Sequence, residues 1–174
     1  MKHLKSYKLF ESVDSTSGLP KESIIEDIKE IFASEIEYKE FPSVDMYGKN
    51  TNEMTTPIIV TGGSTECWTD NSDLEIIPVS IENDPTGYGM RPMKRCKIEY
   101  LKDFIVRLLE YKEQQSLNIN IHTVSPKSHE DVSITLENLE RLCQKGMVIC
   151  SLAIKVEVPL EPELQTVPAY PTQE

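Results

Sequence analysis

The stretch Lys97-Ile-Glu-Tyr-Leu-Lys-Asp-Phe-Ile-Val-Arg-Leu-Leu-Glu-Tyr-Lys-Glu113 carries the clearest structural pattern in this chain. Its main apolar residues lie three or four positions apart: Ile98, Leu101, Phe104, Ile105, Leu108 and Leu109. This spacing is the period of an α-helix that buries one face. We therefore predict a helix over residues 97–113, at the centre of the hydrophobic core.

A different pattern follows this helix after a few residues. Leu117, Ile119 and Ile121 occupy alternate positions, and the residues between and after them are polar: Asn118, Asn120 and His122. Strict alternation is typical of a β-strand with one buried face and one face toward water. The change of period predicts a helix that runs directly into a half-buried strand.

Two further helices are predicted on either side of this centre. Residues 20–36 carry apolar side chains at helical spacing, and Pro20 suits the first turn of a helix. A third helix is expected after Ser133 or Thr135, either of which can cap its first turn. Gly146 is well placed to end that helix.

Stretches rich in β-branched residues predict three more strands: residues 55–61, 74–81 and 151–158. A short fifth strand is expected over residues 35–41, ending at Pro42. We interpret residues 43–55 as a polar loop. Residues 82–97 contain several glycines and prolines and are expected to form a long surface loop.

About five strands and about three helices in a chain of 174 residues indicate the α+β class. We expect a two-layer sandwich, with one mainly antiparallel sheet and the helices on one of its faces. The predicted organisation is a basic leader and linker over residues 1–18, a single domain over residues 19–158, and a proline-rich tail beyond it. The tail is assigned to residues 159–174 because it contains four prolines.

The composition excludes several classes of function. No apolar run approaches the roughly 20 residues that cross a bilayer, and the N-terminus lacks the apolar segment of a secretion signal. A net charge of −11 repels nucleic-acid backbones and anionic lipids. We therefore expect no nucleic acid and no membrane as partner, and instead a basic protein. The four cysteines are scattered, as in a protein with reduced thiols.

No pattern of catalytic or metal-binding residues is convincing. His122 and His129 match no metal-ligand spacing, and no serine–histidine–aspartate or cysteine–histidine arrangement is supported by the sequence. We expect no catalytic residue, no metal and no cofactor. A small hydrolase or nucleotide-binding protein that uses these histidines with the basic residues between Arg91 and Lys97 stays as one alternative.

One basic cluster is a candidate contact for an anion or a protein partner. Arg91, Lys94, Arg95 and Lys97 lie within seven positions, next to the glycines of the predicted long loop and at the entry to the central helix. The alternative is that these charges only balance nearby acids, such as Glu82, Asp84 and the carboxylates of the following helix.

The first residues, Met1-Lys-His-Leu-Lys-Ser-Tyr-Lys-Leu-Phe-Glu-Ser12, form a short basic amphipathic segment. They resemble the capsid-targeting leaders of small proteins of large T-even-like and marine tailed phages. Leu9, Glu11 and Ser12 match the site at which the prohead protease of such phages cuts packaged proteins. The resemblance implies delivery into the virion and cleavage of the Glu11–Ser12 bond. It covers residues 1–12 only.

Together these observations favour a phage-encoded, non-enzymatic accessory protein that binds another protein. Its partner would be basic and host-derived, and its place the host cytoplasm or the virion interior. A second alternative is a viral structural or matrix-like protein that associates with itself through its sheet edges. The sequence leaves the oligomeric state open.

Overall fold

The computed structural model describes residues 19–62, 74–83 and 94–159. Its principal sheet has five strands in the order β3-β4-β9-β6-β7, and every neighbouring pair is antiparallel. These strands are β3 (Pro57–Thr61), β4 (Leu74–Asn83), β6 (Asn118–Val124), β7 (Asp131–Ile134) and β9 (Ser151–Pro159). The helices are α1 (Lys21–Glu35), α2 (Lys102–Gln115) and α3 (Leu136–Gln144). The predicted α+β class, with three helices and one antiparallel sheet of five strands, is confirmed.

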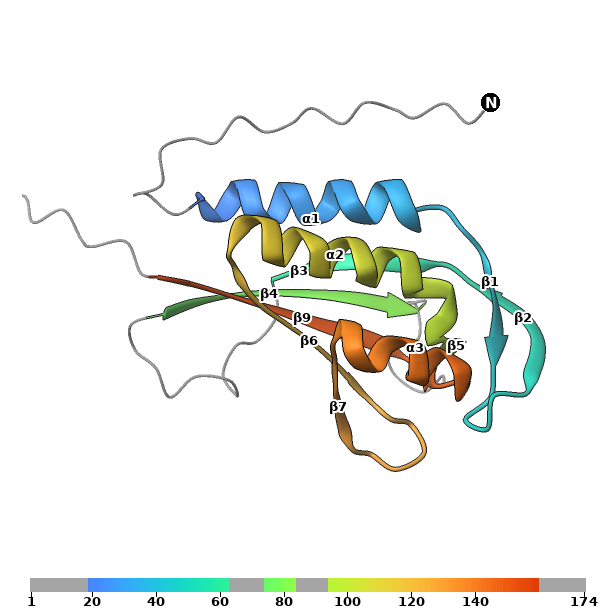
Figure 1. Cartoon of the computed structure of the whole chain (residues 1–174). Helices are drawn as coiled ribbons and strands as arrows, with labels where there is room; N and C mark the ends of the chain where they lie inside the picture. The colour runs from blue at the N-terminus through green and yellow to red at the C-terminus, as the bar shows by residue number, and fades with distance from the viewer. Residues whose placement is uncertain (1–18, 63–73, 84–93, 160–174) are drawn as a thin grey trace, which may run out of the picture.

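The helices and the sheet form two layers because alternate residues of the central strands are buried. On β9 the buried positions are Leu152, Ile154, Val156 and Val158. The buried side of α2 supplies Phe104, Ile105, Leu108 and Leu109 to the same core. In Figure 1, α1 and α2 lie together over one face of the sheet, with α3 beside them.

Three kinds of side-chain contact join α1 to α2, and one of them is an ion pair of Arg107 with Glu35 at 3.5 Å. The rings of Phe32 and Phe104 meet edge to face, with centroids 6.1 Å apart. Closer to the surface, Tyr111 Oη donates a hydrogen bond of 2.7 Å to Asp27 Oδ2. Burial, and then the contact with this carboxylate, raises the pKa of Tyr111.

The segment that follows α1 differs from its prediction. Residues 36–38 form a turn rather than a strand, and strand β1 (Phe41–Val44) begins where the predicted strand was to end. The residues predicted as a loop contain a second strand, β2 (Asn50–Thr55), which pairs with β1 as a hairpin. Five of the six residues of β2 are exposed, so the strand has no alternating apolar pattern by which to recognise it.

The remaining differences concern short elements and boundaries. The predicted loop over residues 82–97 is partly regular, because β4 continues to Asn83 and β5 (Cys96–Lys97) pairs with β8 (Val148–Ile149). The central helix begins as a 3₁₀ turn, η2 (Ile98–Leu101), before α2. Strand β7 was not predicted, and Thr135 rather than Ser133 caps α3. Residues 84–93, the leader and the tail beyond Pro159 lie outside the described residues.

Candidate protein-binding surface

The β1–β2 hairpin and the turn before it present an unusual number of exposed apolar side chains. The described residues expose seven large hydrophobic side chains, and four of them fall between positions 38 and 54: Tyr38, Met46, Tyr47 and Met54. We call these four the hairpin surface. Tyr38 is 85% exposed and Tyr47 75%, so neither contributes its ring to the core.

The tip of the hairpin is held by hydrogen bonds to the side chain and the main chain of Asp45. Asp45 Oδ1 accepts hydrogen bonds from the main-chain N–H groups of Tyr47 and Lys49, each at 2.9 Å. The N–H of Gly48 donates to the Asp45 carbonyl at 3.0 Å, and Gly48 has φ +83, which disfavours other residues. Met46 and Tyr47 are therefore exposed on a turn with a fixed main-chain conformation.

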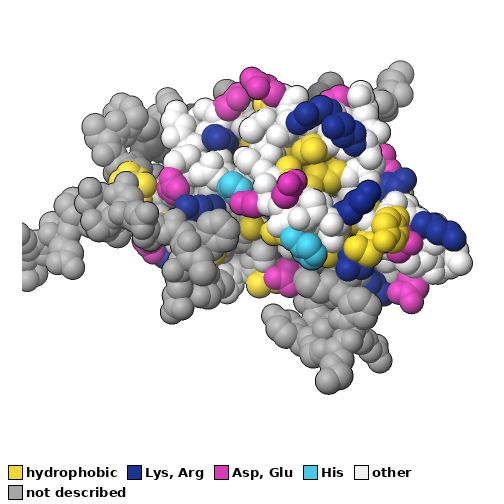
Figure 2. Space-filling model, turned by 90° about the horizontal axis from the view of Figure 1, so that it is seen from below, with side chains coloured by type: hydrophobic (Ala, Val, Ile, Leu, Met, Phe, Trp, Pro, Cys, Tyr) yellow, Lys and Arg dark blue, Asp and Glu magenta, His cyan; other side chains and the backbone are white. Residues whose placement is uncertain are grey.

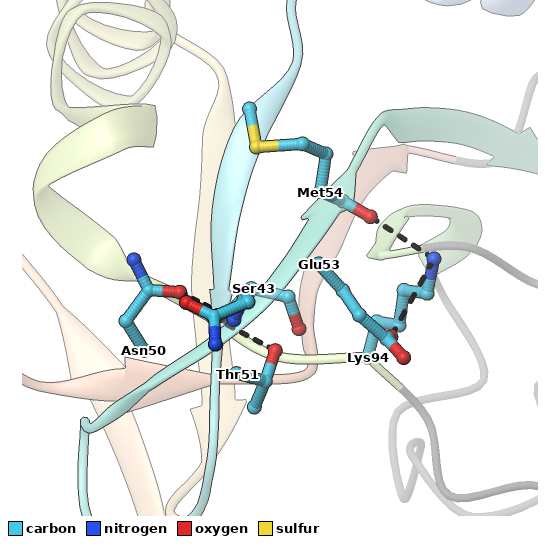
Figure 3. A network of polar contacts seen from close by, with 7 residues as sticks. Ser43, Asn50, Thr51, Glu53, Met54 and Lys94 are labelled. Atoms are coloured by element: carbon cyan, nitrogen blue, oxygen red, sulfur yellow. Dashed lines mark hydrogen bonds and ion pairs between the residues drawn. The ribbon is translucent and has the colours of Figure 1, made fainter.

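Polar contacts also fix the strand that follows the tip (Figure 3). Lys94 Nζ donates to the Met54 carbonyl at 3.0 Å and lies 4.0 Å from a Glu53 carboxylate oxygen. On the other side of the strand, Thr51 Oγ1 donates to the Ser43 carbonyl at 3.1 Å. These contacts hold β2 in place although it buries almost no side chain.

The hairpin is irregular in its middle. Pro42 is opposite Met54 and Val44 is opposite Asn50, so one residue of β1 faces three of β2. Asn52 lies in this bulge with φ +62. A bulge and a left-handed residue interrupt the straight edge that strand-to-strand association needs. The geometry of β2 is therefore unfavourable to self-association through this edge, which the matrix-like alternative would require.

The structure places the described part of the predicted basic cluster beside this hairpin. Lys94 contacts β2 as above, and the Arg95 carbonyl accepts the N–H of Val44 at 2.9 Å. Lys97 Nζ lies 3.9 Å from a Glu99 carboxylate oxygen. Arg91 lies outside the described residues.

Acids close to the cluster balance part of its charge. They are Glu53 and Glu99, whereas Glu82 is bonded to Ser80 within β4. Viewed from below, the space-filling model in Figure 2 shows Lys and Arg gathered with hydrophobic side chains toward the side where Figure 1 places β1 and β2. Exposed apolar side chains near the hairpin are thus accompanied by lysines whose charges are partly balanced by Glu53 and Glu99.

A buried polar contact lies beneath this part of the molecule. Asn83 Nδ2 donates to Cys96 Sγ at 3.3 Å and to the Ile149 carbonyl at 3.2 Å, which joins β4 to β5 and β8. Burial raises the pKa of the Cys96 thiol from 9.0 to about 12, although the bond to Asn83 acts in the opposite direction. The thiol therefore stays protonated at neutral pH and is a poor nucleophile. Sequence reasoning missed Asn83 because it fell at a predicted loop.

The structure places the two predicted histidines on β6 and on the turn that follows it. His122 Nδ1 on β6 is 3.4 Å from Asp131 Oδ2 on β7, and His129 lies in the exposed turn between these strands. Arg95 is beside β1. Among the described residues, no three histidine, cysteine or acidic side chains are grouped so that they could hold a metal ion.

Two other observations concern the sequence predictions. Cys96, Cys143 and Cys150 are free thiols. In the part of the chain that the structure describes, no helix combines the length and the apolar character needed to cross a bilayer. The leader residues Leu9, Glu11 and Ser12 lie outside that part.

The hairpin surface was not predicted, because Met46, Tyr47 and Met54 were assigned to a loop and Tyr38 to a strand over residues 35–41. Its only sequence signal is the presence of Met46, Tyr47 and Met54 in an otherwise polar segment. No protein-family model matches the chain, and neither a curated protein nor a solved structure is detectably similar to it.

Proposed function

We propose that this is a phage-encoded, non-enzymatic accessory protein that acts by binding another protein, and that the hairpin surface makes the contact. The observation that carries this proposal is the exposure of two tyrosines and two methionines within 17 residues, between Tyr38 and Met54. Tyrosine and methionine are enriched at protein interfaces relative to other surfaces.

The main chain of the hairpin favours binding because it is already ordered. Asp45 fixes the tip and Lys94 fixes β2 through direct hydrogen bonds. A partner that contacts Tyr47 and its neighbours then has less main-chain entropy to remove, which leaves more of the contact energy for affinity.

Tyr38 supports the same interpretation by its conformation. It has φ +62 and is 85% exposed. The left-handed region costs about 1–2 kcal/mol for residues with a Cβ. Because the ring is exposed, its packing within the folded chain does not offset this cost. Strained residues of this kind are concentrated at functional sites.

The charge of the whole chain favours a basic partner, which we infer to be a host protein. At −11 the chain attracts cationic proteins over a distance of about one Debye length. Near the hairpin, Lys94 and Lys97 are accompanied by Glu53 and Glu99. The long-range field would therefore accelerate encounter, while apolar contacts at the hairpin would supply most of the affinity.

The experiment that tests the contact is affinity capture with the full-length chain in three forms. The first is the natural sequence, the second carries Met46→Ser and Tyr47→Ser, and the third carries Leu19→Ser and Val124→Ser. The third is a matched control, because it removes two exposed apolar side chains elsewhere. We expect a basic protein that the first and third forms retain and the second loses, with direct binding of the purified partner at least tenfold weaker for the second. Equal capture by all three forms would contradict the proposal.

The phage origin rests on the leader and is tested separately. Leu9, Glu11 and Ser12 resemble a prohead-protease site, and cleavage would deliver the protein into the virion interior. The intact mass of the protein from purified particles should correspond to a chain that starts at Ser12. A particle-associated chain that retains Met1 would exclude packaging by this route without affecting the proposed contact.

A further inference from the structure

The principal sheet is incomplete at the first half of β6. The ladder of β6 with β9 includes Asn118–His122, whereas its ladder with β7 includes only Ile121–Val124. Within the described residues, Asn118–Asn120 therefore has a strand on one side and none on the other. Main-chain N–H and C=O groups along such an edge are available to an additional strand.

This gap is produced by the way in which α3 begins. Thr135 Oγ1 accepts the N–H of Asn138, and Asn138 Oδ1 accepts the N–H of Thr135, so the two residues form a capping box. Asn138 Nδ2 also donates to the Ser133 carbonyl at 2.8 Å. The chain consequently leaves the ladder after Ile134, and the gap is a built feature of the β7–α3 connection.

A groove with a volume of about 320 Å³ lies at this gap. Buried residues of the core, Leu109, Ile119 and Ile134, contribute to its lining. Its walls are the end of α2 and the first turn of α3, where Leu136 is 45% exposed. The volume is at the lower end of the range for ligand pockets, which suits a peptide side chain.

Carboxylates predominate among the charged residues of the groove. Glu113 on α2 and Glu137 on α3 are both exposed and line it from two different helices, and Lys112 is the lysine of the lining. The chain as a whole carries −11. A cationic segment is therefore better matched to this groove than an anionic one.

We propose that β6 accepts an additional strand at this gap, supplied by an extended segment of a partner protein in which lysine or arginine flanks an apolar residue. The main chain of the segment pairs with Asn118–Asn120 and continues the line of β7. Its apolar side chain enters the groove, and its cationic side chains meet Glu113 and Glu137. Main-chain pairing gives affinity and the groove gives specificity, as in other cases of strand addition. This contact is distinct from the hairpin surface.

The test uses the full-length chain and an eight-residue peptide of alternating lysine and valine, with nuclear magnetic resonance to map the contact. We expect the largest amide shifts at Asn118–Asn120 and at Leu136. The same peptide with N-methylated main-chain nitrogens should bind at least tenfold more weakly, because it cannot donate to β6. Shifts confined to other elements, or equal binding of the methylated peptide, would overturn the proposal.

Charge-reversal variants test the specificity. Glu113→Lys with Glu137→Lys should weaken binding of the lysine–valine peptide at least tenfold and strengthen binding of a glutamate–valine peptide. Glu26→Lys with Glu30→Lys is the matched control, because both residues are exposed on α1 and the net charge changes equally. If both double variants lose the same affinity for the peptide, the peptide is attracted by the net charge of the whole chain, and the groove is not the binding site. Tyr47→Ala should leave peptide binding unchanged, which separates this result from a failure of the hairpin proposal.

Discussion

The central strands of the sheet and the β1–β2 hairpin are ordered by different forces. On β9 every second residue is buried against the helices, whereas β2 leaves five of its six residues exposed. The first region is held by removal of apolar area from water. The second is held by hydrogen bonds between main-chain atoms and three side chains: Asp45 accepts, while Thr51 and Lys94 donate. The hairpin therefore keeps a defined conformation while its apolar side chains stay available to a partner.

The largest expected effect comes from a core substitution. Phe104 has no exposed area and contacts Phe32 edge to face. Phe104→Ala should lower the free energy of unfolding by about 3–5 kcal/mol through lost burial and the cavity left behind. Tyr47→Ala, at an exposed aromatic, should change it by less than about 0.5 kcal/mol. Urea denaturation followed by circular dichroism measures both, and a similar loss for the two variants would break the comparison.

Alkaline pH should weaken the buried region next. Burial raises the pKa of Cys96 from 9.0 to about 12, so between these values the folded chain keeps a proton that the unfolded chain releases. Stability from this group is complete below pH 9 and is lost as the pH rises toward 12. From pH 8 to pH 10.5 the expected loss is about 2 kcal/mol. The raised pKa of Tyr111 acts in the same direction.

Urea midpoints at a series of pH values measure this effect. Cys96→Ala should flatten the decline. An equally steep decline in the Cys96 variant would mean that another group is responsible.

A smaller effect is expected from the carboxylate at the hairpin tip. Asp45→Ala removes the acceptor of two main-chain hydrogen bonds and should destabilise the tip by about 1 kcal/mol. Asp45→Asn is the matched control, because both bonds use Oδ1 and an asparagine keeps an oxygen there. Hydrogen exchange of the Tyr47 and Lys49 amides should accelerate in the alanine variant and much less in the asparagine variant. Unchanged exchange in both would show that Asp45 does not hold the tip.

The smallest effect has the opposite sign. Tyr38→Gly should stabilise the fold by about 0.5 kcal/mol, because glycine adopts the left-handed conformation without steric cost but loses more entropy on folding. The same variant should bind the partner more weakly, while Tyr38→Phe should change neither property greatly. A destabilised glycine variant would mean that the tyrosine ring supports the fold. Tyr38 would then no longer be counted among the binding residues of the hairpin surface.

The sequence predictions were more accurate for elements held by buried apolar side chains than for elements held by polar contacts. Helix α2 and strand β6 were predicted near their observed positions because each buries one face, and burial imposes a period on the sequence. For the N-cap of α3 the sequence offered two residues, Ser133 and Thr135, and the structure shows that Thr135 is the cap. Strand β7 was missed because its four residues are too few to show a period.

The candidate sites were predicted less well. The sequence singled out the basic cluster as a candidate contact, which stays a prediction, but it did not show the hairpin that Lys94 contacts from forty positions away. The groove was not predicted, since it exists only where α2, β6 and α3 meet.

The sequence by itself determined the α+β class, the central helix and the strands that alternate beside it, because a residue's burial depends mainly on its own hydrophobicity and on its local period. Only the tertiary structure decided that residues 41–55 form an ordered hairpin and that, among the residues the structure describes, β7 leaves part of β6 without a second neighbouring strand. The hairpin depends on hydrogen bonds between residues that are distant in the chain, and the gap beside β6 depends on where β7 ends. Neither feature leaves a repeating pattern in the sequence.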